Sequence, residues 1–154
     1  MVKFLIPFNL AMLIVWSGCL LKPNKMTNLE IIKSTYEGKT SEENGKNLAN
    51  YAAPNLSWTE ARGFPYAGTY IGLENVTKNV FTRLGSEWID YKFTPEDYVA
   101  ADDKVVAYGT YTGSYKITGK PFAARVAHVW QLRDGKIIKF EQFVDSQIVN
   151  NSMK

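Results

Sequence analysis

The stretch VVAYGTYTGSYKITGKPFAARVAHVWQLRDGKIIKFEQFV, residues 105–144, decides the fold. It divides into three runs that are rich in β-branched and aromatic residues: 105–115, 122–132 and 137–144. Thr118-Gly119-Lys120 separates the first two runs. Asp134-Gly135 separates the last two, and both of its residues tolerate the positive φ of a tight hairpin turn. The stretch therefore predicts three consecutive antiparallel strands.

The residues before this stretch extend the predicted sheet. Trp88–Phe93 alternates in polarity, Pro95 is expected to interrupt the strand, and the β pattern resumes at residues 98–101. Gly109 and Gly113 indicate bulges or bends within the next strand. A meander of long strands with glycine bends curls, so helices from elsewhere in the chain must cover one of its faces.

The sequence before residue 88 predicts three helices. Capping boxes that start at Thr27 and Thr40 open the first two helices, and Pro54 prevents extension of the second. The third helix follows Gly72 and is expected to stop at Gly85.

Between the second and third helices, residues 55–60 predict a short strand, with Leu56 on one face and Trp58 on the other. Residues 61–72 are rich in Gly and Pro and predict a loop with a short strand at 69–71. The expected fold is α+β, a curled antiparallel sheet wrapped around about three helices. Such a cone has an open end, an apolar floor and a mouth that carries a few polar groups.

Composition excludes several classes of protein. The chain has 154 residues, of which 45% are hydrophobic and 21% charged, which fits one globular domain rather than a disordered chain. A net charge of +3 is too small to indicate a nucleic-acid-binding protein. One Cys and one His cannot form an internal disulfide or a Cys/His zinc site. The sequence contains no dinucleotide fingerprint or P-loop, so we expect no cofactor and no metal.

Residues 1–25 differ from the rest of the chain. Lys3, an apolar run from Phe4 to Trp16 and Ser17-Gly18-Cys19 form the pattern of a signal peptide, and the last three residues resemble a bacterial lipobox with Cys19 as the lipidated residue. Two alternatives remain open: an uncleaved membrane anchor, and translation that starts at Met26 in a cytoplasmic protein. We therefore separate a leader, 1–25, from a domain, 26–154.

The domain resembles the SnoaL-like and ketosteroid-isomerase-like branch of the nuclear transport factor 2-like superfamily. The resemblance covers about residues 28–149 and rests on Trp58–Glu60, Gly63–Gly72, Ala127–Trp130, Leu132–Ile137 and Phe140–Asp145. It implies a cone-shaped, cystatin-like α+β barrel and, commonly, a homodimer that pairs sheet to sheet. The superfamily includes isomerases, polyketide cyclases and proteins without known chemistry, so the resemblance does not fix the reaction.

Two residues are the first candidates for acid–base chemistry. Asp145 ends the last strand and would ordinarily be a solvated or capping residue. The resemblance implies that an acidic residue at this place transfers a proton from the mouth of the pocket, where apolar neighbours raise its pKa. His128 lies mid-strand, and either packs in the core or lines the cone and positions a substrate oxygen or the carboxylate. If the strand is regular, only one of Gln142 and Asp145 enters the pocket.

Glu60 is the third catalytic candidate, because it shares the face of Trp58, although a solvated strand-end Glu is the alternative. The ligand-binding residues are expected to be aromatic: Trp58, Tyr70, Trp130 and Phe143. Three tyrosines are weaker candidates for oxyanion donors and are expected to be packing residues: Tyr66, Tyr70 and Tyr108.

Two functions follow from these observations. The first is a small cofactor-free acid–base enzyme, similar to an isomerase or cyclase, that acts on a hydrophobic carbonyl compound. The second is a module of the same fold that binds an apolar ligand or mediates association without turnover. If Asp145 faces solvent, away from a cavity that His128 lines, its catalytic assignment fails and binding becomes the favoured function. We expect a homodimer, a small hydrophobic partner molecule and no nucleic acid.

Overall fold

The computed structural model describes residues 25–154. The predicted leader, including Cys19, lies outside the described residues except for Lys25, and its export, anchoring or cytoplasmic alternative stays a prediction. Within residues 25–154, no helix is both long enough and apolar enough to cross a bilayer.

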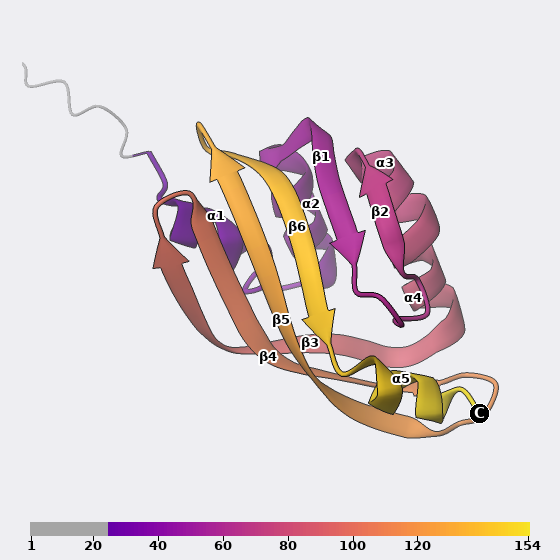
Figure 1. Cartoon of the computed structure of the whole chain (residues 1–154). Helices are drawn as coiled ribbons and strands as arrows, with labels where there is room; N and C mark the ends of the chain where they lie inside the picture. The colour runs from indigo at the N-terminus through magenta and orange to yellow at the C-terminus, as the bar shows by residue number, and fades with distance from the viewer. Residues whose placement is uncertain (1–24) are drawn as a thin grey trace, which may run out of the picture.

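A six-stranded sheet forms one layer, in the order β2-β1-β6-β5-β4-β3. Its strands are β1 (Ala52–Glu60), β2 (Gly68–Ile71), β3 (Trp88–Ala101), β4 (Lys104–Tyr115), β5 (Pro121–Arg133) and β6 (Lys136–Val144). The long strands β3–β5 bend strongly along their length (Figure 1). The predicted α+β fold with a curled sheet is therefore confirmed.

Most of the helical elements lie behind the sheet and cover one of its faces, whereas the last helix lies beyond the end of β6 (Figure 1). The elements are α1 (Asn28–Ser34), α2 (Ser41–Tyr51), α3 (Leu73–Val76), the π-helical turn η1 (Thr77–Phe81), α4 (Thr82–Glu87) and α5 (Ser146–Ser152). The Thr27 and Thr40 side chains accept from backbone N–H groups of Glu30 and Glu43, as the capping pattern predicts.

The third helix differs from the expectation at its end. Residues 73–87 form one continuous helical segment through α3, η1 and α4, and Gly85 lies within it. The helix ends only where Trp88 adopts the extended backbone of β3. A Cβ at Gly85 would have no atom within 4 Å, so this glycine marks no close contact and no left-handed turn.

Pro95 does not divide β3 into two strands. The pairing of β3 with β4 continues through Pro95, opposite Gly109, and a register shift follows between Pro95 and Asp97. Proline is tolerated here because β3 is an edge strand and the bulge removes the need for regular pairing. Gly109 allows the close approach: a Cβ there would collide with the Thr94 carbonyl oxygen and lie 2.9 Å from Pro95 Cα.

The sheet also contains a pairing that the sequence did not reveal. β1 pairs in parallel with β6, with Trp58 beside Phe140 and Thr59 beside Glu141, while the other neighbouring strands are antiparallel. This pairing inserts the first part of the chain into the sheet. It brings the end of β1 next to the end of β6.

The core lies between the helices and the inner face of the sheet. Inward residues alternate along β4, β5 and β6, and the largest fully buried side chains include Trp130, Phe140, Ile32, Leu56 and Ile137. The opposite face of the central strands carries half-buried or exposed residues.

The different surroundings of two glycines give a paired stability prediction. We expect Gly109→Ala to lower the free energy of unfolding by on the order of 3 kcal/mol, because the new methyl collides with the β3 backbone. Gly85→Ala should instead raise it by about 1 kcal/mol, because Ala is the better helix former at an uncrowded position. Urea denaturation of both variants measures the difference, and equal effects would contradict the described bulge.

Candidate functional site

A cavity of about 370 Å³ lies between the helices and the inner face of the sheet. Apolar side chains form most of its wall: Leu48, Trp58, Val80, Phe81, Leu84, Phe93, Trp130 and Phe140. The strands contribute five polar lining residues: Glu60, Tyr91, Tyr111, His128 and Gln142. The segment from the end of α1 into α2 contributes four more: Thr35, Tyr36, Ser41 and Asn44. Such a volume and such a wall suit a small, mainly apolar molecule.

Glu60 ends β1 and is only 4% exposed. Trp58 Nε1 donates to its Oε1 at 2.7 Å, whereas its Oε2 has no hydrogen-bond partner among the described residues. Burial raises the pKa of Glu60 to about 7, and the Trp58 hydrogen bond opposes this rise only in part. Glu60 is therefore a buried carboxyl that gains and loses its proton near neutral pH, with one oxygen free.

His128 lies on β5 between two tyrosine hydroxyls. Tyr36 Oη is 2.7 Å from Nδ1, and Tyr111 Oη is 2.5 Å from Nε2. Burial lowers the pKa of His128 to about 3, so the imidazole is neutral at physiological pH. The sequence left open whether His128 packs in the core or lines the cavity, and the structure shows that it does both.

Further hydrogen bonds fix the two tyrosines. Trp130 Nε1 donates to Tyr36 Oη at 3.0 Å, and Gln142 Nε2 donates to Tyr111 Oη at 3.2 Å. The backbone N–H of Ala61 donates to Gln142 Oε1, which orients the amide with its NH₂ group toward Tyr111. We call the group formed by Tyr36, His128 and Tyr111, with its donors Trp130 and Gln142, the histidine clamp.

Tyr91 completes the polar lining from β3. Its ring lies 5.1 Å from that of Tyr111, and its hydroxyl has no hydrogen-bond partner among the described residues. Glu60 Oε2 and Tyr91 Oη are therefore buried polar atoms at the cavity that lack partners. Unpaired buried groups are costly, so their presence beside a cavity indicates a place for a polar ligand atom.

Asp145 does not face this cavity, which corrects the first sequence prediction. It is exposed, lies beyond β6, and caps α5 by accepting from the Ile148 N–H at 3.3 Å. Phe143, expected to bind ligand, is 53% exposed on the opposite face of the sheet. The physical reason is strand alternation: Gln142 points inward, and a helix that the sequence analysis missed begins directly after Asp145.

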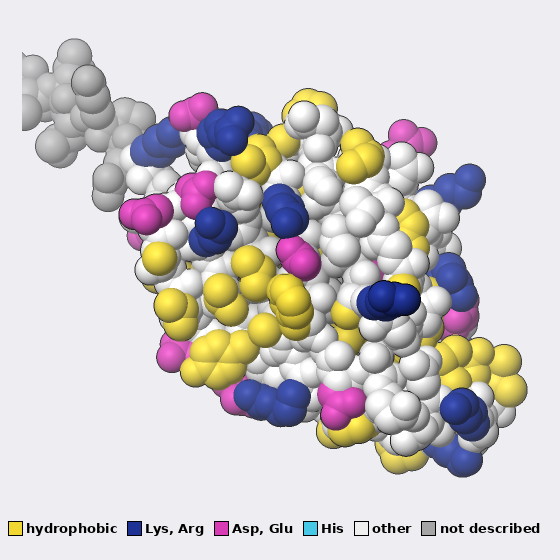
Figure 2. Space-filling model, in the orientation of Figure 1, with side chains coloured by type: hydrophobic (Ala, Val, Ile, Leu, Met, Phe, Trp, Pro, Cys, Tyr) yellow, Lys and Arg dark blue, Asp and Glu magenta, His cyan; other side chains and the backbone are white. Residues whose placement is uncertain are grey.

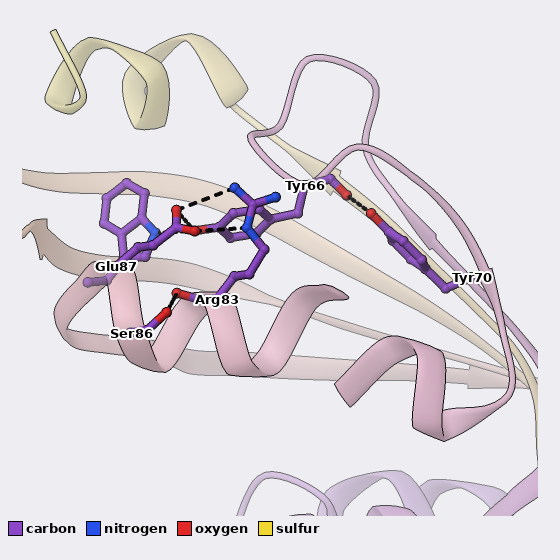
Figure 3. A network of polar contacts seen from close by, with 6 residues as sticks. Tyr66, Tyr70, Arg83, Ser86 and Glu87 are labelled. Carbon is purple, nitrogen blue, oxygen red and sulfur yellow. Dashed lines mark hydrogen bonds and ion pairs between the residues drawn. The ribbon is translucent and has the colours of Figure 1, made fainter. Parts of the chain in front are cut away.

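The other predicted ligand-binding residues divide into two groups. Trp58 and Trp130 line the cavity, and their role in binding a ligand stays a prediction. Tyr70 does not: its hydroxyl donates to the Tyr66 carbonyl at 2.8 Å, and both tyrosines lie in a network outside the cavity lining (Figure 3). There Tyr66 donates to Glu87 and accepts from Trp88, so the Gly- and Pro-rich loop is fixed to α4. Tyr108 also lies outside the cavity, on the outer face of β4.

Sequence reasoning did not name three tyrosines of the site, Tyr36, Tyr91 and Tyr111, and it named Gln142 only as the alternative to Asp145. Alternation did contain a signal for two of them, because Tyr91 shares a strand face with Phe93, and Tyr111 shares one with the buried Val105 and Ala107. Among residues 25–154, no group of three His, Cys, Asp or Glu side chains is arranged to hold a metal ion.

Comparison with known proteins identifies the relatives of this fold. The family described as SnoaL-like domain matches residues 36–140. An NTF2-like protein from Burkholderia thailandensis is 41% identical, with a TM-score of 0.76, over 80% of this chain and 95% of that one. TerC, crystallised with polyporic acid, is 21% identical, with a TM-score of 0.71, over 82% of this chain and 97% of that one.

A candidate SnoaL-like polyketide cyclase from Mesorhizobium loti is 19% identical, with a TM-score of 0.64, over 77% of this chain and 99% of that one. No curated protein sequence matches the chain. At these lower identities the likeness concerns the fold alone.

The raised pKa of Glu60 predicts a characteristic dependence of stability on pH. Between pH 4.5 and 7 the unfolded chain is ionised at this position while the folded chain keeps its proton. The folded state then binds more protons, so the free energy of unfolding falls as pH rises, by on the order of 3 kcal/mol across this window. In Glu60→Gln this decline should be absent.

His128 makes the free energy of unfolding rise with pH, because its pKa in the folded state lies below the usual 6.5. It makes this contribution in both the wild type and Glu60→Gln. The difference between the wild type and Glu60→Gln in denaturant titrations therefore isolates Glu60. A difference that stays constant from pH 4.5 to 7 would show that the carboxyl keeps an ordinary pKa.

Proposed function

The chain belongs to the SnoaL-like domain family, and on that premise we propose that it is a cofactor-free acid–base enzyme acting on a small hydrophobic carbonyl compound. One observation carries the proposal: Glu60 is a buried carboxyl with a pKa of about 7 and one unpaired oxygen at an apolar cavity. A base with a pKa near the working pH is suited to removing a proton from carbon.

The proposed chemistry begins when ionised Glu60 takes a proton from the carbon beside the substrate carbonyl. The electron pair of the broken C–H bond moves toward the carbonyl oxygen and forms an enolate, which hydroxyl donors at the cavity stabilise. Glu60 then returns the proton to another carbon, which gives an isomer. Alternatively, the enolate carbon attacks a second carbonyl and closes a ring, the π electrons of that carbonyl move to its oxygen, and the new alkoxide takes the proton back from Glu60. Both outcomes conserve protons and electrons without a redox partner.

The outward position of Asp145 favours a second candidate, ligand binding without turnover. It removes the base that the sequence analysis placed first, and the cavity wall alone would suit a passive apolar ligand. Glu60 is the reason to prefer catalysis, because a passive apolar site gains nothing from a buried carboxyl that lacks a partner for one oxygen. The fold of TerC, crystallised with polyporic acid, is compatible with either candidate.

We also propose that the protein is a homodimer that pairs through the outer face of its sheet. Val99 and Phe143 are 57% and 53% exposed on this face, and Val106 and Tyr108 are half-buried beside them. Figure 2 looks onto the face and shows hydrophobic side chains gathered there among scattered charges. A second copy of the same surface would remove this area from water.

The catalytic proposal predicts deuterium exchange at carbon. Cyclic enones and β,γ-unsaturated ketones of one or two rings, incubated with the protein in D₂O, should gain deuterium next to the carbonyl. The rate should rise with pH and level off above about 7, because the base must be ionised. Glu60→Gln should lower the rate by about 10² to 10⁴, a typical cost of losing a general base.

The matched control is Asp145→Asn, which removes an exposed carboxylate outside the cavity and should leave exchange unchanged. Proton NMR of the ketones follows the exchange. Retention of these ketones by the wild type without any exchange would favour passive binding. Loss of exchange in Asp145→Asn with full exchange in Glu60→Gln would reverse the assignment of the base.

The dimer proposal predicts a change of mass in light scattering. The wild type should have the mass of two chains at micromolar concentration, and Phe143→Arg should shift it toward one chain by placing a charge in the apolar contact. Ile117→Arg is the control, because Ile117 is 83% exposed in the turn between β4 and β5. A wild-type protein that is monomeric at this concentration would contradict the proposal.

A further inference from the structure

We propose that His128 is a positioning residue that carries its proton on Nε2 and thereby directs the hydroxyl proton of Tyr111 into the cavity, as a hydrogen-bond donor for a carbonyl oxygen. The ligand atom that Tyr111 would contact is therefore a hydrogen-bond acceptor. The catalytic part of this proposal rests on the proposed function. The proposal follows from a count of the protons available to the histidine clamp.

Two N–H groups of the clamp can act only as hydrogen-bond donors. The Trp130 indole N–H donates to Tyr36 Oη, and the Gln142 amide N–H donates to Tyr111 Oη. Each phenol oxygen therefore already accepts one hydrogen bond. Each phenol also has one proton of its own to place, and each lies within hydrogen-bonding distance of one imidazole nitrogen.

A neutral imidazole has one N–H and one lone pair, so it can accept from one tyrosine only and must donate to the other. If Tyr36 donates to Nδ1, then Nε2–H donates to Tyr111 Oη. Tyr111 then accepts from both His128 and Gln142, and its own proton finds no acceptor within the clamp. In the other tautomer Tyr36 is left with the free proton. In each case one tyrosine proton points out of the clamp.

The surroundings of the two tyrosines favour Tyr111 as the donor. Its ring lies 5.1 Å from that of Tyr91, whose hydroxyl lines the same cavity and has no hydrogen-bond partner among the described residues. Burial raises the pKa of Tyr111 and of Tyr36, and after burial Glu60 is the leading influence on Tyr111 but a minor one on Tyr36. An ionised Glu60 thus favours the arrangement in which the Tyr111 proton points away from His128 and into the cavity.

This arrangement gives the site a fixed division of roles. Glu60 Oε2 is an acceptor that can take a proton, and Tyr111 is a donor that cannot turn back to His128, because Nε2–H occupies that direction. Preorganised donors of this kind stabilise the negative oxygen of an enolate without reorganising during the reaction. The ligand atom that fits beside Tyr111 is therefore a carbonyl oxygen.

The test uses the fact that the chain contains a single histidine. Full-length protein labelled with ¹⁵N in the imidazole gives signals from His128 alone, and couplings to the ring protons distinguish Nδ1 from Nε2. In ligand-free protein above pH 7, where Glu60 is ionised, we expect the proton on Nε2 and a lone pair on Nδ1. A proton on Nδ1, or rapid exchange between the two nitrogens, would overturn the proposal without any variant.

Three tyrosine variants sharpen the result. Tyr111→Phe removes the acceptor of Nε2–H, so the proton should move to Nδ1 and donate to Tyr36, because an orphaned buried donor is costly. Tyr36→Phe should leave the proton on Nε2. The control Tyr108→Phe, on the outer face of β4, should change nothing. A proton that stays on Nε2 in a folded Tyr111→Phe protein would contradict the clamp.

The exchange assay separates this proposal from the proposed function. Tyr111→Phe should slow deuterium exchange by about 10² to 10³, the typical cost of losing one such donor, while Tyr108→Phe should not. An Nε2 proton in a wild type that exchanges nothing would refute catalysis and leave the clamp intact. Exchange by Glu60 together with an Nδ1 proton would refute the clamp alone.

Discussion

The parallel pairing of β1 with β6 is the constraint on which the site depends. It stacks Trp58 on Phe140, with ring centroids 3.7 Å apart, and so places two aromatic rings side by side in the cavity wall. It also joins the end of β1 to β6 through the bond from the Ala61 N–H to Gln142 Oε1. Glu60 directly follows Thr59, the last β1 residue paired with β6, and it is only 4% exposed. The raised pKa of its carboxyl is therefore a consequence of sheet topology as much as of its own neighbours.

Local patterns in the sequence predicted the fold well, because alternation, capping residues and turn residues act over a few positions. The same alternation placed Trp58, Glu60, His128 and Trp130 on inward faces, where the structure has them. The errors arose where a local signal competes with tertiary packing. Gly85 continues a helix because the packed segment around it outweighs the preference of one glycine, and the bulge beside Gly109 absorbs a proline that would break a regular strand.

The assignment of the acidic residue failed for a different reason. Asp145 and Gln142 are three residues apart, so alternation allows only one of them inside, but the sequence offers no means of choosing between them without the pairing of β6. The histidine clamp could not be predicted from the sequence for the same reason. Tyr36 follows α1, Tyr111 lies on β4 and Gln142 on β6. Only the registers of two strand pairs, β4–β5 and β5–β6, together with the placement of α1, bring them to one imidazole. Contacts between segments that are distant in the sequence produce no periodic pattern of residue types from which they could be predicted.

Burial, rather than neighbouring charges, shifts the pKa values of the site residues, and this restricts the ligands that the cavity can bind. Desolvation is the leading cause of the shifted pKa values of both Glu60 and His128, and it acts in opposite senses on an acid and a base. Among the described residues that line the cavity, there is no Lys or Arg to neutralise an anion. A carboxylate or phosphate ligand would lose its hydration and meet an ionised Glu60 with no compensating charge. A neutral molecule avoids both costs, and a carbonyl compound becomes anionic only in the transition state, where a hydroxyl donor stabilises it most.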